Sequence, residues 1–295
     1  PCTRRRLSLV VMGSAIPVVA VTGGTLGIGR HAVDVLAADG TRIGVCARRE
    51  AATVAAEVTA SHAVLAVGID ADVVDPEALD RFANAVVREL GTPTGLLCCA
   101  GVLGPVGTID ETDSEAWASA VAVNLVGVAN TIRAFVPHMA AGASIVTMAG
   151  GGIGGPNVAG RISAYTASKA AVASLTETLG GELEQRDIRV NAIAPGAIAT
   201  RFTDPLLDAG PARAGSDLYE ATRRQRSNPD ELQPFADLLR FLLSDESVAI
   251  NGRTLSARWE NPAVLTETVD DIRSSSRYQL RRIDEVLYGE IGSGD

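Results

Sequence analysis

A glycine-rich loop between an apolar run and a helical pattern constrains the fold of this chain more than any other feature. The loop has the sequence TGGTLGIG over residues 22–29, directly after an apolar run at 16–21 and before a helix expected over 28–38. Glycines with this spacing permit a tight turn and let the backbone approach a pyrophosphate, which then rests on the helix N-terminus. In this context the loop predicts a dinucleotide site on the first strand of a parallel sheet, rather than a plain glycine-rich turn.

Short apolar runs rich in β-forming residues alternate with helical patterns along the rest of the chain. Strands are expected at residues 16–21, 41–46, 63–67, 95–99, 144–148, 188–193 and 253–257, and helices at 28–38, 51–59, 77–90, 114–139, 163–183 and 230–243. Such alternation is typical of a parallel sheet with helices on both faces. We therefore predict an α/β fold, a single doubly wound Rossmann-type domain with a parallel seven-stranded sheet. Weak periodicity over residues 197–228 indicates a mobile loop or short helices over the site.

Both ends of the chain extend beyond the predicted domain. The 295 residues contain neither a repeat nor a linker, so we expect one domain over 16–260 and a C-terminal extension over 261–295. The basic run at 4–6 superficially resembles a twin-arginine export signal. Cleavage behind it would destroy the first strand, so we interpret residues 1–15 as a disordered leader in which Met12 could be the natural start.

Composition argues against several classes of partner. A net charge of −9 and a pI near 4.9 argue against nucleic acid or an anionic membrane as the main partner. No apolar run reaches the ~18–20 residues of a membrane span. The four cysteines and three histidines show no metal-ligand spacing, so we predict no metal site and a reduced, cytoplasmic protein.

Tyr165 and Lys169 lie four residues apart in an alanine-rich segment with a helical pattern. This spacing places a phenol and an ammonium on the same helical face. The pKa of a free tyrosine is near ~10, and a nearby cation favours the phenolate and lowers that pKa toward neutral pH. The pair predicts a proton donor and acceptor, although on a single helix such a spacing is more often a surface pair. Its position downstream of a phosphate-binding loop favours the catalytic interpretation.

The end of the second predicted strand carries two arginines, Arg48 and Arg49. In dinucleotide folds an acidic residue near this position binds the ribose hydroxyls of NAD, whereas an arginine accommodates the 2′-phosphate of NADP. The first acid is Glu50, and Arg30 adds a positive charge nearby. The pattern favours NADP(H) over NAD(H), and the alternative interpretation is a solvated basic turn.

These motifs together resemble the short-chain dehydrogenase/reductase family over residues 16–257. The glycine loop and the Tyr-x-x-x-Lys spacing match that family, and IRVNAIAPG at 188–196 is similar to its sixth strand and Pro-Gly turn. The resemblance implies that Tyr165, Lys169 and Asn124 are catalytic. It also implies an adenine contact at residues 72–73 and a nicotinamide contact at Thr200. The residues that it places around the cofactor are Thr22, Gly23, Thr25, Gly27, Ile28, Gly29, Arg48, Arg49, Asp72, Val73, Ala100, Gly101, Tyr165, Lys169, Pro195, Gly196, Ile198 and Thr200.

Two departures from the family pattern fall close to the predicted site. The family usually has Asn-Asn-Ala-Gly after its fourth strand, whereas this chain has CCAG at 98–101, so small thiols replace two amides that stabilise the sheet. The family's substrate-binding serine, aligned from the fifth strand, falls at Gly150. Loss of one hydrogen-bond donor to a developing oxyanion typically costs ~10²–10³ in rate. We expect weaker tethering of the fourth strand and another donor in place of the serine.

Several groups are candidates to replace that serine. They are the backbone N–H groups of the glycine run after residue 149, Thr147, Asn157 and Ser163. Ser163 is better interpreted as the N-cap of the helix at 163–183. After the last strand, RWE at 258–260 replaces the usual Asp-Gly-Gly, and the stretch at 278–282 could cover the site or a subunit interface.

We predict an NADP(H)-dependent oxidoreductase that interconverts a secondary alcohol and a ketone by hydride transfer, with Tyr165 and Lys169 as the acid–base pair. Its substrate is a small carbonyl or alcohol molecule that the sequence does not identify. By family resemblance the protein is a homodimer or homotetramer that associates through the helices at 114–139 and 163–183. The alternatives are a non-catalytic dinucleotide-binding sensor or partner subunit, and a nucleotide-sugar epimerase or dehydratase.

Overall fold

One parallel sheet organises the computed structural model, which describes residues 16–150, 159–196, 198, 200–227 and 232–280. Its strands are β1 (Val18–Thr22), β2 (Arg42–Ala47), β3 (Ala66–Asp70), β4 (Gly95–Cys98), β5 (Ser144–Met148), β6 (Arg189–Ala194) and β7 (Thr254–Ser256). They lie in the order β3-β2-β1-β4-β5-β6-β7, and each neighbouring pair is parallel. The predicted seven-stranded, doubly wound Rossmann-type domain is confirmed.

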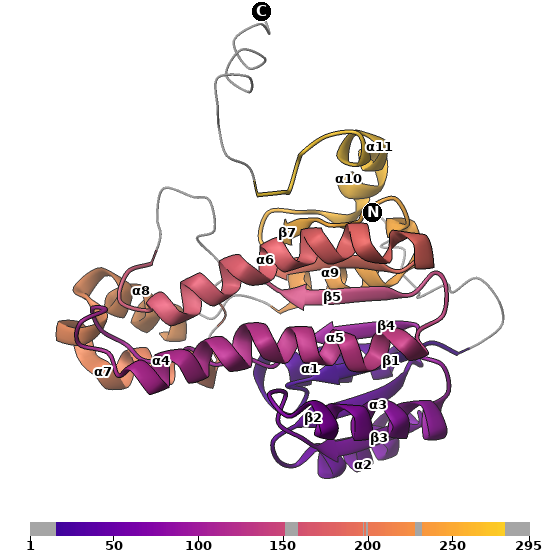
Figure 1. Cartoon of the computed structure of the whole chain (residues 1–295), viewed down its shortest axis with the longest axis horizontal. Coiled ribbons are helices and arrows are strands. Elements are labelled where there is room, and N and C mark those ends of the chain that lie inside the picture. Colours follow the sequence, from indigo (N-terminus) through magenta and orange to yellow (C-terminus); the bar gives the residue numbers. More distant parts are fainter. Residues whose placement is uncertain (1–15, 151–158, 197, 199, 228–231, 281–295) are drawn as a thin grey trace, which may run out of the picture.

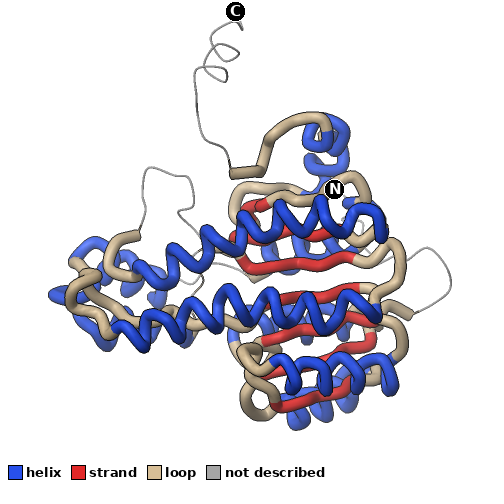
Figure 2. Tube along the Cα trace, in the orientation of Figure 1, coloured by secondary structure: helices blue, strands red, loops and turns tan. Residues whose placement is uncertain are grey.

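Helices cover both faces of this sheet (Figures 1 and 2). They are α1 (Gly27–Ala38), α2 (Ala51–His62), α3 (Pro76–Leu90), α4 (Ser114–Val121), α5 (Gly127–Phe135), α6 (Ser163–Leu183), α7 (Asp204–Ala214), α8 (Ser216–Ser227), α9 (Gln233–Leu243), α10 (Pro262–Glu267) and α11 (Val269–Arg273). One apolar core lies under α3, α5 and α6, where Phe82 and Phe135 meet edge to face at 5.2 Å. The second lies under α1, α2 and α9 and contains the buried Leu36 and Phe241.

The segment between residues 114 and 138 is one continuous helical path with a change of winding in the middle. A π-helical turn at Ala122–Val126 joins α4 to α5, and a 3₁₀ turn follows at Val136–His138. The prediction of a single uniform helix over 114–139 is therefore corrected. Single π-helical turns inside α-helices are frequent at functional sites. By length and composition this path could cross a membrane, contrary to the expectation that no apolar run is long enough, but half of its most apolar window is buried inside the domain.

Local capping explains where other elements begin and end. Asp75 caps α3, since its carboxylate accepts a hydrogen bond from the N–H of Ala78 at 3.1 Å and Pro76 occupies the first turn. The strand predicted at 63–67 begins three residues later, at Ala66. The reason is that α2 continues to His62 and Ala63 ends it in the left-handed conformation, with φ of 55°.

Two short helices occupy the region where the sequence predicts short helices or a loop. Figure 1 shows α7 and α8 beyond the carboxyl ends of the strands, beside the first turns of α4 and α6. A third apolar cluster joins them to the domain; its buried members are Leu103, Val106, Ile162, Leu206 and Ala214. These helices therefore form a cover over the end of the sheet at which the predicted site lies.

The described part of the C-terminal extension, residues 262–280, packs on the domain. Leu265 of α10 and Ile272 of α11 are each 1% exposed and belong to the second core. Beyond α11 the chain returns along β7, where the N–H of Thr254 donates to the carbonyl oxygen of Tyr278 at 2.8 Å. The extension is thus part of the same packed unit, and it covers the outer edge of the sheet.

Candidate active site

The glycine-rich loop packs tightly against the ends of β2 and β4. The N–H of Gly23 donates to the carbonyl oxygen of Cys46 at 2.7 Å, and a Cβ atom at Gly23 would lie 2.8 Å from the backbone of Ala100. A Cβ at Gly29 would lie 2.1 Å from the carbonyl oxygen of Gly23, so this packing requires glycine. The start of α1 has no side-chain cap, and its N–H groups suit an anion such as a pyrophosphate.

The loop lies where the sheet order reverses, between β1 and β4, and open α/β sheets bind ligands at that point. Thr200 reaches the same place from the segment after β6, because a Cβ at Gly27 would lie 3.5 Å from its side chain. Its hydroxyl accepts a hydrogen bond from the N–H of Phe202 at 3.3 Å and so starts a short 3₁₀ turn. Gly196, with φ of 83°, and the buried Ile198 lie between β6 and Thr200. The predicted cofactor residues of three strands thus meet at one edge of the sheet.

The arginines expected at the adenosine end of the cofactor differ in environment. Arg48 and Arg49 are exposed after β2, and among the described residues neither forms an ion pair. Arg30 is different, because its guanidinium lies 3.1 Å from the Asp34 carboxylate and 2.9 Å from that of Glu57. Two carboxylates therefore offset the positive charge that Arg30 was expected to add.

The segment expected to contact adenine is fixed against α5. A carboxylate oxygen of Asp72 accepts from the N–H of Val74 at 3.1 Å. Val73 is buried, and the side-chain amide of Asn130 donates to its carbonyl oxygen at 3.3 Å. Close packing of Val73 on Gly127, where a Cβ would lie 2.5 Å away, completes the attachment.

Tyr165 and Lys169 lie in the first two turns of α6, beside the carboxyl ends of β4 and β5. The Lys169 ammonium donates to the carbonyl oxygen of Met148 at 2.8 Å, and a Cβ at Gly101 would lie 3.7 Å from that nitrogen. The Tyr165 ring packs on Phe202, with 5.4 Å between ring centroids. Lys169 is also the only lysine in the chain, since the other 25 of its 26 basic residues are arginines.

Burial changes the pKa values of both members of this pair. It raises the pKa of Tyr165 to about 12 and lowers the pKa of Lys169 to about 8. The expected lowering of the tyrosine pKa by the lysine is therefore not observed in this structure. The reason is that the apolar cluster under α7 and α8 surrounds the phenol, whereas the ammonium is bonded to Met148.

Asn124 is completely buried in the π-helical turn, and its amide connects three segments. The oxygen accepts from the N–H of Val102 at 2.8 Å, and the nitrogen donates to the carbonyl oxygen of Val102 at 2.8 Å. The nitrogen also donates to the hydroxyl of Ser168 at 3.0 Å, and that hydroxyl donates to the carbonyl oxygen of Tyr165. Asn124 thus fixes the tyrosine helix and the loop after β4 relative to one another.

Gly150 lies against the catalytic pair, at the position of the missing serine. A Cβ atom there would lie 2.9 Å from Cβ and 3.1 Å from Cγ of Lys169, and 3.4 Å from Cε1 of Tyr165. Real Cβ atoms hardly ever approach so closely, and the Lys169 Cβ belongs to the rigid base of its side chain. The end of β5 therefore approaches α6 too closely for a serine in this arrangement.

The side chains proposed to replace the serine have other partners or lie outside the described residues. The hydroxyl of Thr147 is buried and lies 2.7 Å from that of Thr176. Ser163 is not the N-cap of α6, because Ile162 holds that position; its hydroxyl instead accepts from the indole N–H of Trp117 at 3.0 Å. Asn157 and the glycine run at 151–155 lie outside the described residues.

The two thiols after β4 are unreactive by environment. Burial raises the pKa of Cys99 to about 11, and it raises the pKa of Cys98 further still. Cys98 pairs in register with Thr22 of β1 and Thr147 of β5, so β4 is held on both sides by main-chain bonds. The weaker tethering expected from the loss of two amides therefore does not extend to the backbone of the sheet.

Sequence reasoning missed several residues that shape the site. Phe202 covers Tyr165, Ser168 connects Asn124 to the tyrosine helix, and the Met148 carbonyl binds the lysine. Only Ser168 carried a local signal, because it precedes Lys169 on the same helix. The other two contacts join segments 37 and 21 residues away from their partners, and no periodicity in the sequence reports them.

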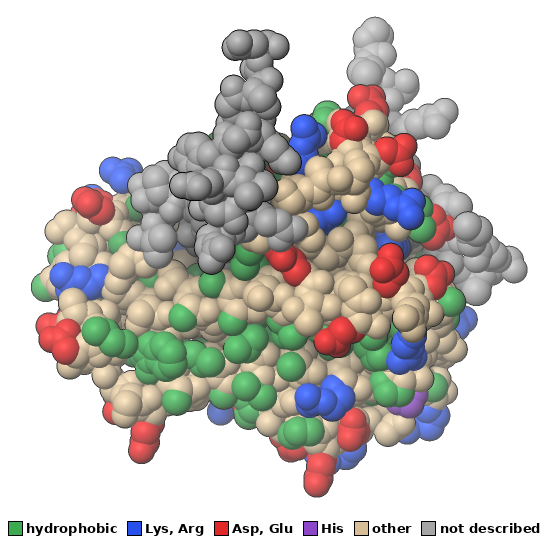
Figure 3. All heavy atoms as spheres, turned by 45° about the horizontal axis from the view of Figure 1, so that its top comes forward, with side chains coloured by type: hydrophobic (Ala, Val, Ile, Leu, Met, Phe, Trp, Pro, Cys, Tyr) green, Lys and Arg blue, Asp and Glu red, His purple; other side chains and the backbone are tan. Residues whose placement is uncertain are grey.

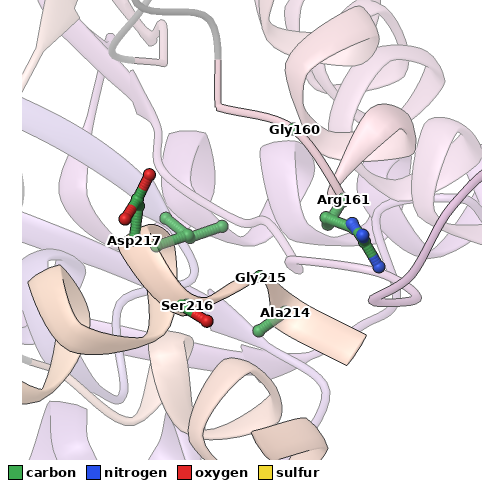
Figure 4. Close-up of a pocket in the computed structure, with 7 residues that line it drawn as sticks. Gly160, Arg161, Ala214, Gly215, Ser216 and Asp217 are labelled. Carbon is green, nitrogen blue, oxygen red and sulfur yellow. The ribbon is translucent and has the colours of Figure 1, made fainter. Parts of the chain in front are cut away.

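The structure contains two notable cavities. One of about 240 Å³ lies between residues 160–161 and 214–218. In Figure 4 the side chains of Arg161 and Asp217 point away from each other, and the Arg161 guanidinium donates to the carbonyl oxygens of Ala212 and Arg213 at 3.4 Å. The second, of about 400 Å³, lies between Gly150, the ends of β6 and β7, and residues 278–280.

Comparison with known proteins identifies the family. The family model described as "Enoyl-(Acyl carrier protein) reductase" matches residues 23–257. An uncharacterized short-chain type dehydrogenase/reductase, y4mP, of Sinorhizobium fredii is 30% identical over 240 residues, which is 78% of this chain and 90% of that protein. A short-chain dehydrogenase of Burkholderia cenocepacia in complex with NADP has 28% identity and a TM-score of 0.68 over 81% of this chain and 94% of its own. NAD⁺-bound xylitol dehydrogenase has 26% identity and a TM-score of 0.70 over 81% and 96%.

The fold and the site define a class of oxidoreductases that use a nicotinamide dinucleotide. The chain belongs to the short-chain dehydrogenase/reductase family.

Proposed function

We propose that this protein is an NADP(H)-dependent reductase that converts a small ketone to a secondary alcohol, with Tyr165 and Lys169 as its acid–base pair. One observation carries the proposal: the only lysine of the chain stands beside the tyrosine at the carboxyl edge of the sheet. A lysine ammonium is a compact charge whose pKa shifts readily on burial, which suits a residue that acts on a nearby phenol.

In this mechanism Tyr165 donates its phenolic proton to the carbonyl oxygen of the substrate. The phenol is protonated at neutral pH, as a proton donor must be, and burial raises its pKa further. Bound nicotinamide supplies the hydride acceptor or donor, and its oxidised form adds a positive charge that lowers the tyrosine pKa in the reverse direction.

The remaining residues position this pair. Lys169 is oriented by the Met148 carbonyl and, by family resemblance, binds the nicotinamide ribose. Asn124 fixes the loop after β4 against α6. By the same resemblance, it holds a water molecule beside Lys169 that relays protons. In place of the serine, we propose that backbone N–H groups after Gly150 stabilise the substrate oxygen, because a side chain at that position would collide with Lys169.

Arg48 and Arg49 support NADP(H) over NAD(H). Both are exposed and without an ion-pair partner among the described residues, at the strand end where a 2′-phosphate would lie. Structural neighbours of this chain bind either NADP or NAD⁺, so fold alone does not decide between them.

We also propose a cytoplasmic homodimer or homotetramer that associates through the face of the long helices. A band of hydrophobic side chains crosses this face in Figure 3, and Val126, between α4 and α5, is 46% exposed. Unpartnered apolar area on a helix face is typical of an interface between protein subunits.

The test is a fluorescence titration of the full chain with NADPH and NADH, followed by a panel of ketones and alcohols. The proposal requires tighter binding of NADPH and turnover of at least one ketone. Tyr165→Phe should keep the cofactor affinity and lower kcat about 10³-fold, because positioned proton transfer contributes ~10²–10⁴ in rate.

The missing serine favours one alternative, a non-catalytic dinucleotide-binding sensor or partner subunit. Tight cofactor binding with no turnover of any ketone or alcohol would select that alternative. Turnover that survives Tyr165→Phe unchanged would reject the tyrosine mechanism for either an alcohol dehydrogenase or a nucleotide-sugar epimerase.

A further inference from the structure

We propose that the cavity between β7 and the C-terminal segment is the substrate subsite, and that Arg258 binds an anionic group of the substrate there. This inference rests on the proposed function and names its substrate class: ketones that carry a carboxylate or phosphate at a distance from the carbonyl. The argument depends on the position of the cavity, on the state of Arg258 and on the carboxylates around it.

The cavity has the size and the construction of a small-molecule site. Its volume is about 400 Å³, and ligand pockets in proteins are typically about 300–1,000 Å³. The ends of β6 and β7 form its floor, Ala173 of α6 forms one wall, and residues 278–280 form another. The C-terminal extension therefore builds a wall that the strands and helices of the sheet leave out.

Gly150 connects this cavity to the catalytic pair. It lines the cavity, and a Cβ atom at Gly150 would lie only 3.4 Å from Cε1 of Tyr165, the ring carbon next to the one that bears the hydroxyl. Gly150 is thus shared between the cavity and the proposed acid–base pair, and the cavity begins next to Tyr165 and Lys169. We place the substrate carbonyl at this end of the cavity.

Arg258 lines the cavity, and its guanidinium is oriented so that its N–H donors can bind an anion. The guanidinium carbon stands 5.0 Å from the centroid of the Trp259 ring, in a cation–π contact. Stacking restrains the plane of the guanidinium and leaves its N–H donors at the edge, where they match a carboxylate or phosphate. Within the described residues no carboxylate forms an ion pair with Arg258.

The carboxylates nearest to this wall are used by the protein itself. Glu260 accepts a hydrogen bond from the hydroxyl of Tyr278 at 2.9 Å, and Glu177 accepts from the N–H of Leu280. Among the described residues, the buried hydroxyl of Thr254, which also lines the cavity, has no hydrogen-bond partner. A bound oxyanion would give Arg258 an ion-pair partner.

Trp259 adds a surface that a ligand would cover. Its side chain is 75% exposed, which is a large apolar exposure for a residue that lines a cavity. It is one of only two tryptophans in the chain. Binding beside it should therefore change the intrinsic fluorescence.

The experiment compares charged and neutral forms of the same ketones. The full chain is assayed with NADPH and a series of ω-1 keto acids of increasing length, each beside its methyl ester, and with dihydroxyacetone phosphate beside dihydroxyacetone. We expect kcat/KM for the best acid to exceed that of its ester at least tenfold. The carboxylate and phosphate arms show which oxyanion the site accepts.

Two matched variants assign the preference to Arg258. Arg258→Gln should raise KM for the best acid at least tenfold and change kcat/KM for its ester less than twofold. Arg273→Gln removes the same charge from an exposed position on α11, outside the cavity lining, and should leave both values unchanged. An equal loss on acid and ester, or the same loss in Arg273→Gln, would overturn the proposal.

A binding measurement separates failure of the subsite from failure of the proposed function. Saturable quenching of tryptophan emission by the best keto acid is expected in the wild type and in Arg273→Gln, and its loss is expected in Arg258→Gln. If neutral ketones turn over while acids bring neither a rate advantage nor quenching, the anionic subsite is rejected and the reductase stands. If acids quench but no ketone turns over, the subsite stands and the proposed reaction fails.

Discussion

The sheet edge that forms the candidate site has two halves, one around β1, β2 and β4 and one around β5, β6 and β7, and they differ in how they depart from the family pattern. The half around β1, β2 and β4 carries the family's glycine loop, where backbone contacts explain Gly23 and Gly29, although Cys98 and Cys99 replace two amides of the family pattern. The half around β5, β6 and β7 departs from that pattern at Gly150 and again at residues 258–260, and it is completed by the C-terminal extension.

This difference follows from what each half has to bind. A pyrophosphate and a ribose are the same in every member of such a family, so the backbone that approaches them has little freedom to vary. A substrate differs from enzyme to enzyme, and sites built from loops and added segments can change with it. We therefore expect the half around the glycine loop to bind the cofactor and the half around Gly150 to determine substrate specificity.

The largest effect after loss of the tyrosine is expected at Lys169. Lowering its pKa from 10.5 to about 8 corresponds to roughly 3 kcal/mol of destabilisation at neutral pH. Because the unfolded chain binds the proton more tightly, stability should rise with pH between about 8 and 10.5, as this penalty is relieved. Lys169→Met should abolish turnover and yet unfold at higher urea at pH 7, with the difference shrinking at pH 9.5.

A direct titration sharpens the same prediction. Since Lys169 is the only lysine, protein labelled with ¹⁵Nζ-lysine gives a single side-chain signal whose pKa can be read without assignment. A side-chain signal that shows no titration below pH 10 would contradict the burial argument. Measurements should stay below pH 10, because the raised pKa of Tyr165 makes stability fall again above that pH.

In the cofactor half, Gly29→Ala should weaken NADPH binding about 10²-fold and lower the thermal midpoint. The added Cβ would lie 2.1 Å from the carbonyl oxygen of Gly23, so the loop must move away from its position. Gly181→Ala is the matched control, because no atom lies within 4 Å of the added Cβ and the residue sits inside α6. Equal behaviour of the two variants would show that the loop is not constrained as described.

In the substrate half, restoring the family's serine should not restore activity. Gly150→Ser places a Cβ 2.9 Å from that of Lys169, so we expect kcat to fall about 10- to 30-fold through displacement of the lysine. The kcat of Gly150→Ala should fall by a similar factor, because the added Cβ, and not the hydroxyl, displaces Lys169. A Gly150→Ser variant with a higher kcat than the wild type would show that this site accepts the family's serine, contrary to the prediction.

The smallest effect is expected at the adenosine end of the cofactor half. Replacing Arg48 and Arg49 by glutamine should weaken NADPH binding about tenfold and leave NADH binding unchanged, because only the 2′-phosphate contact is removed. Arg30→Gln is the control, since Asp34 and Glu57 already neutralise that arginine. Parallel titrations with both cofactors measure the difference.

Sequence reasoning predicted the fold where the signal was local. Alternating apolar runs and helical patterns located all seven strands, and they placed α3 to within one residue. The start of β3 was missed because a left-handed residue at Ala63 extends the connection, and single residues of that kind leave little trace in composition.

The sequence indicated which residues lie together at the candidate site, but it did not indicate the contacts that they make. Tyr165 and Lys169 were found from their spacing, and the structure places them at the same edge as the glycine loop. The bond from Lys169 to Met148, the cover of Phe202 and the pairing of Arg30 depend on how distant segments pack, which no spacing encodes. Burial, rather than the neighbouring charge, consequently dominates the pKa of the tyrosine.

The hydrogen bond from Thr254 to Tyr278 also has a consequence for the order of synthesis. The ribosome makes residues 278–280 after the whole sheet, so the outer edge of β7 stays open while the rest of the domain folds. An open edge can pair with a neighbouring nascent chain, whereas a closed one cannot. Closure of this edge of the sheet therefore waits until residues 278–280 have been made.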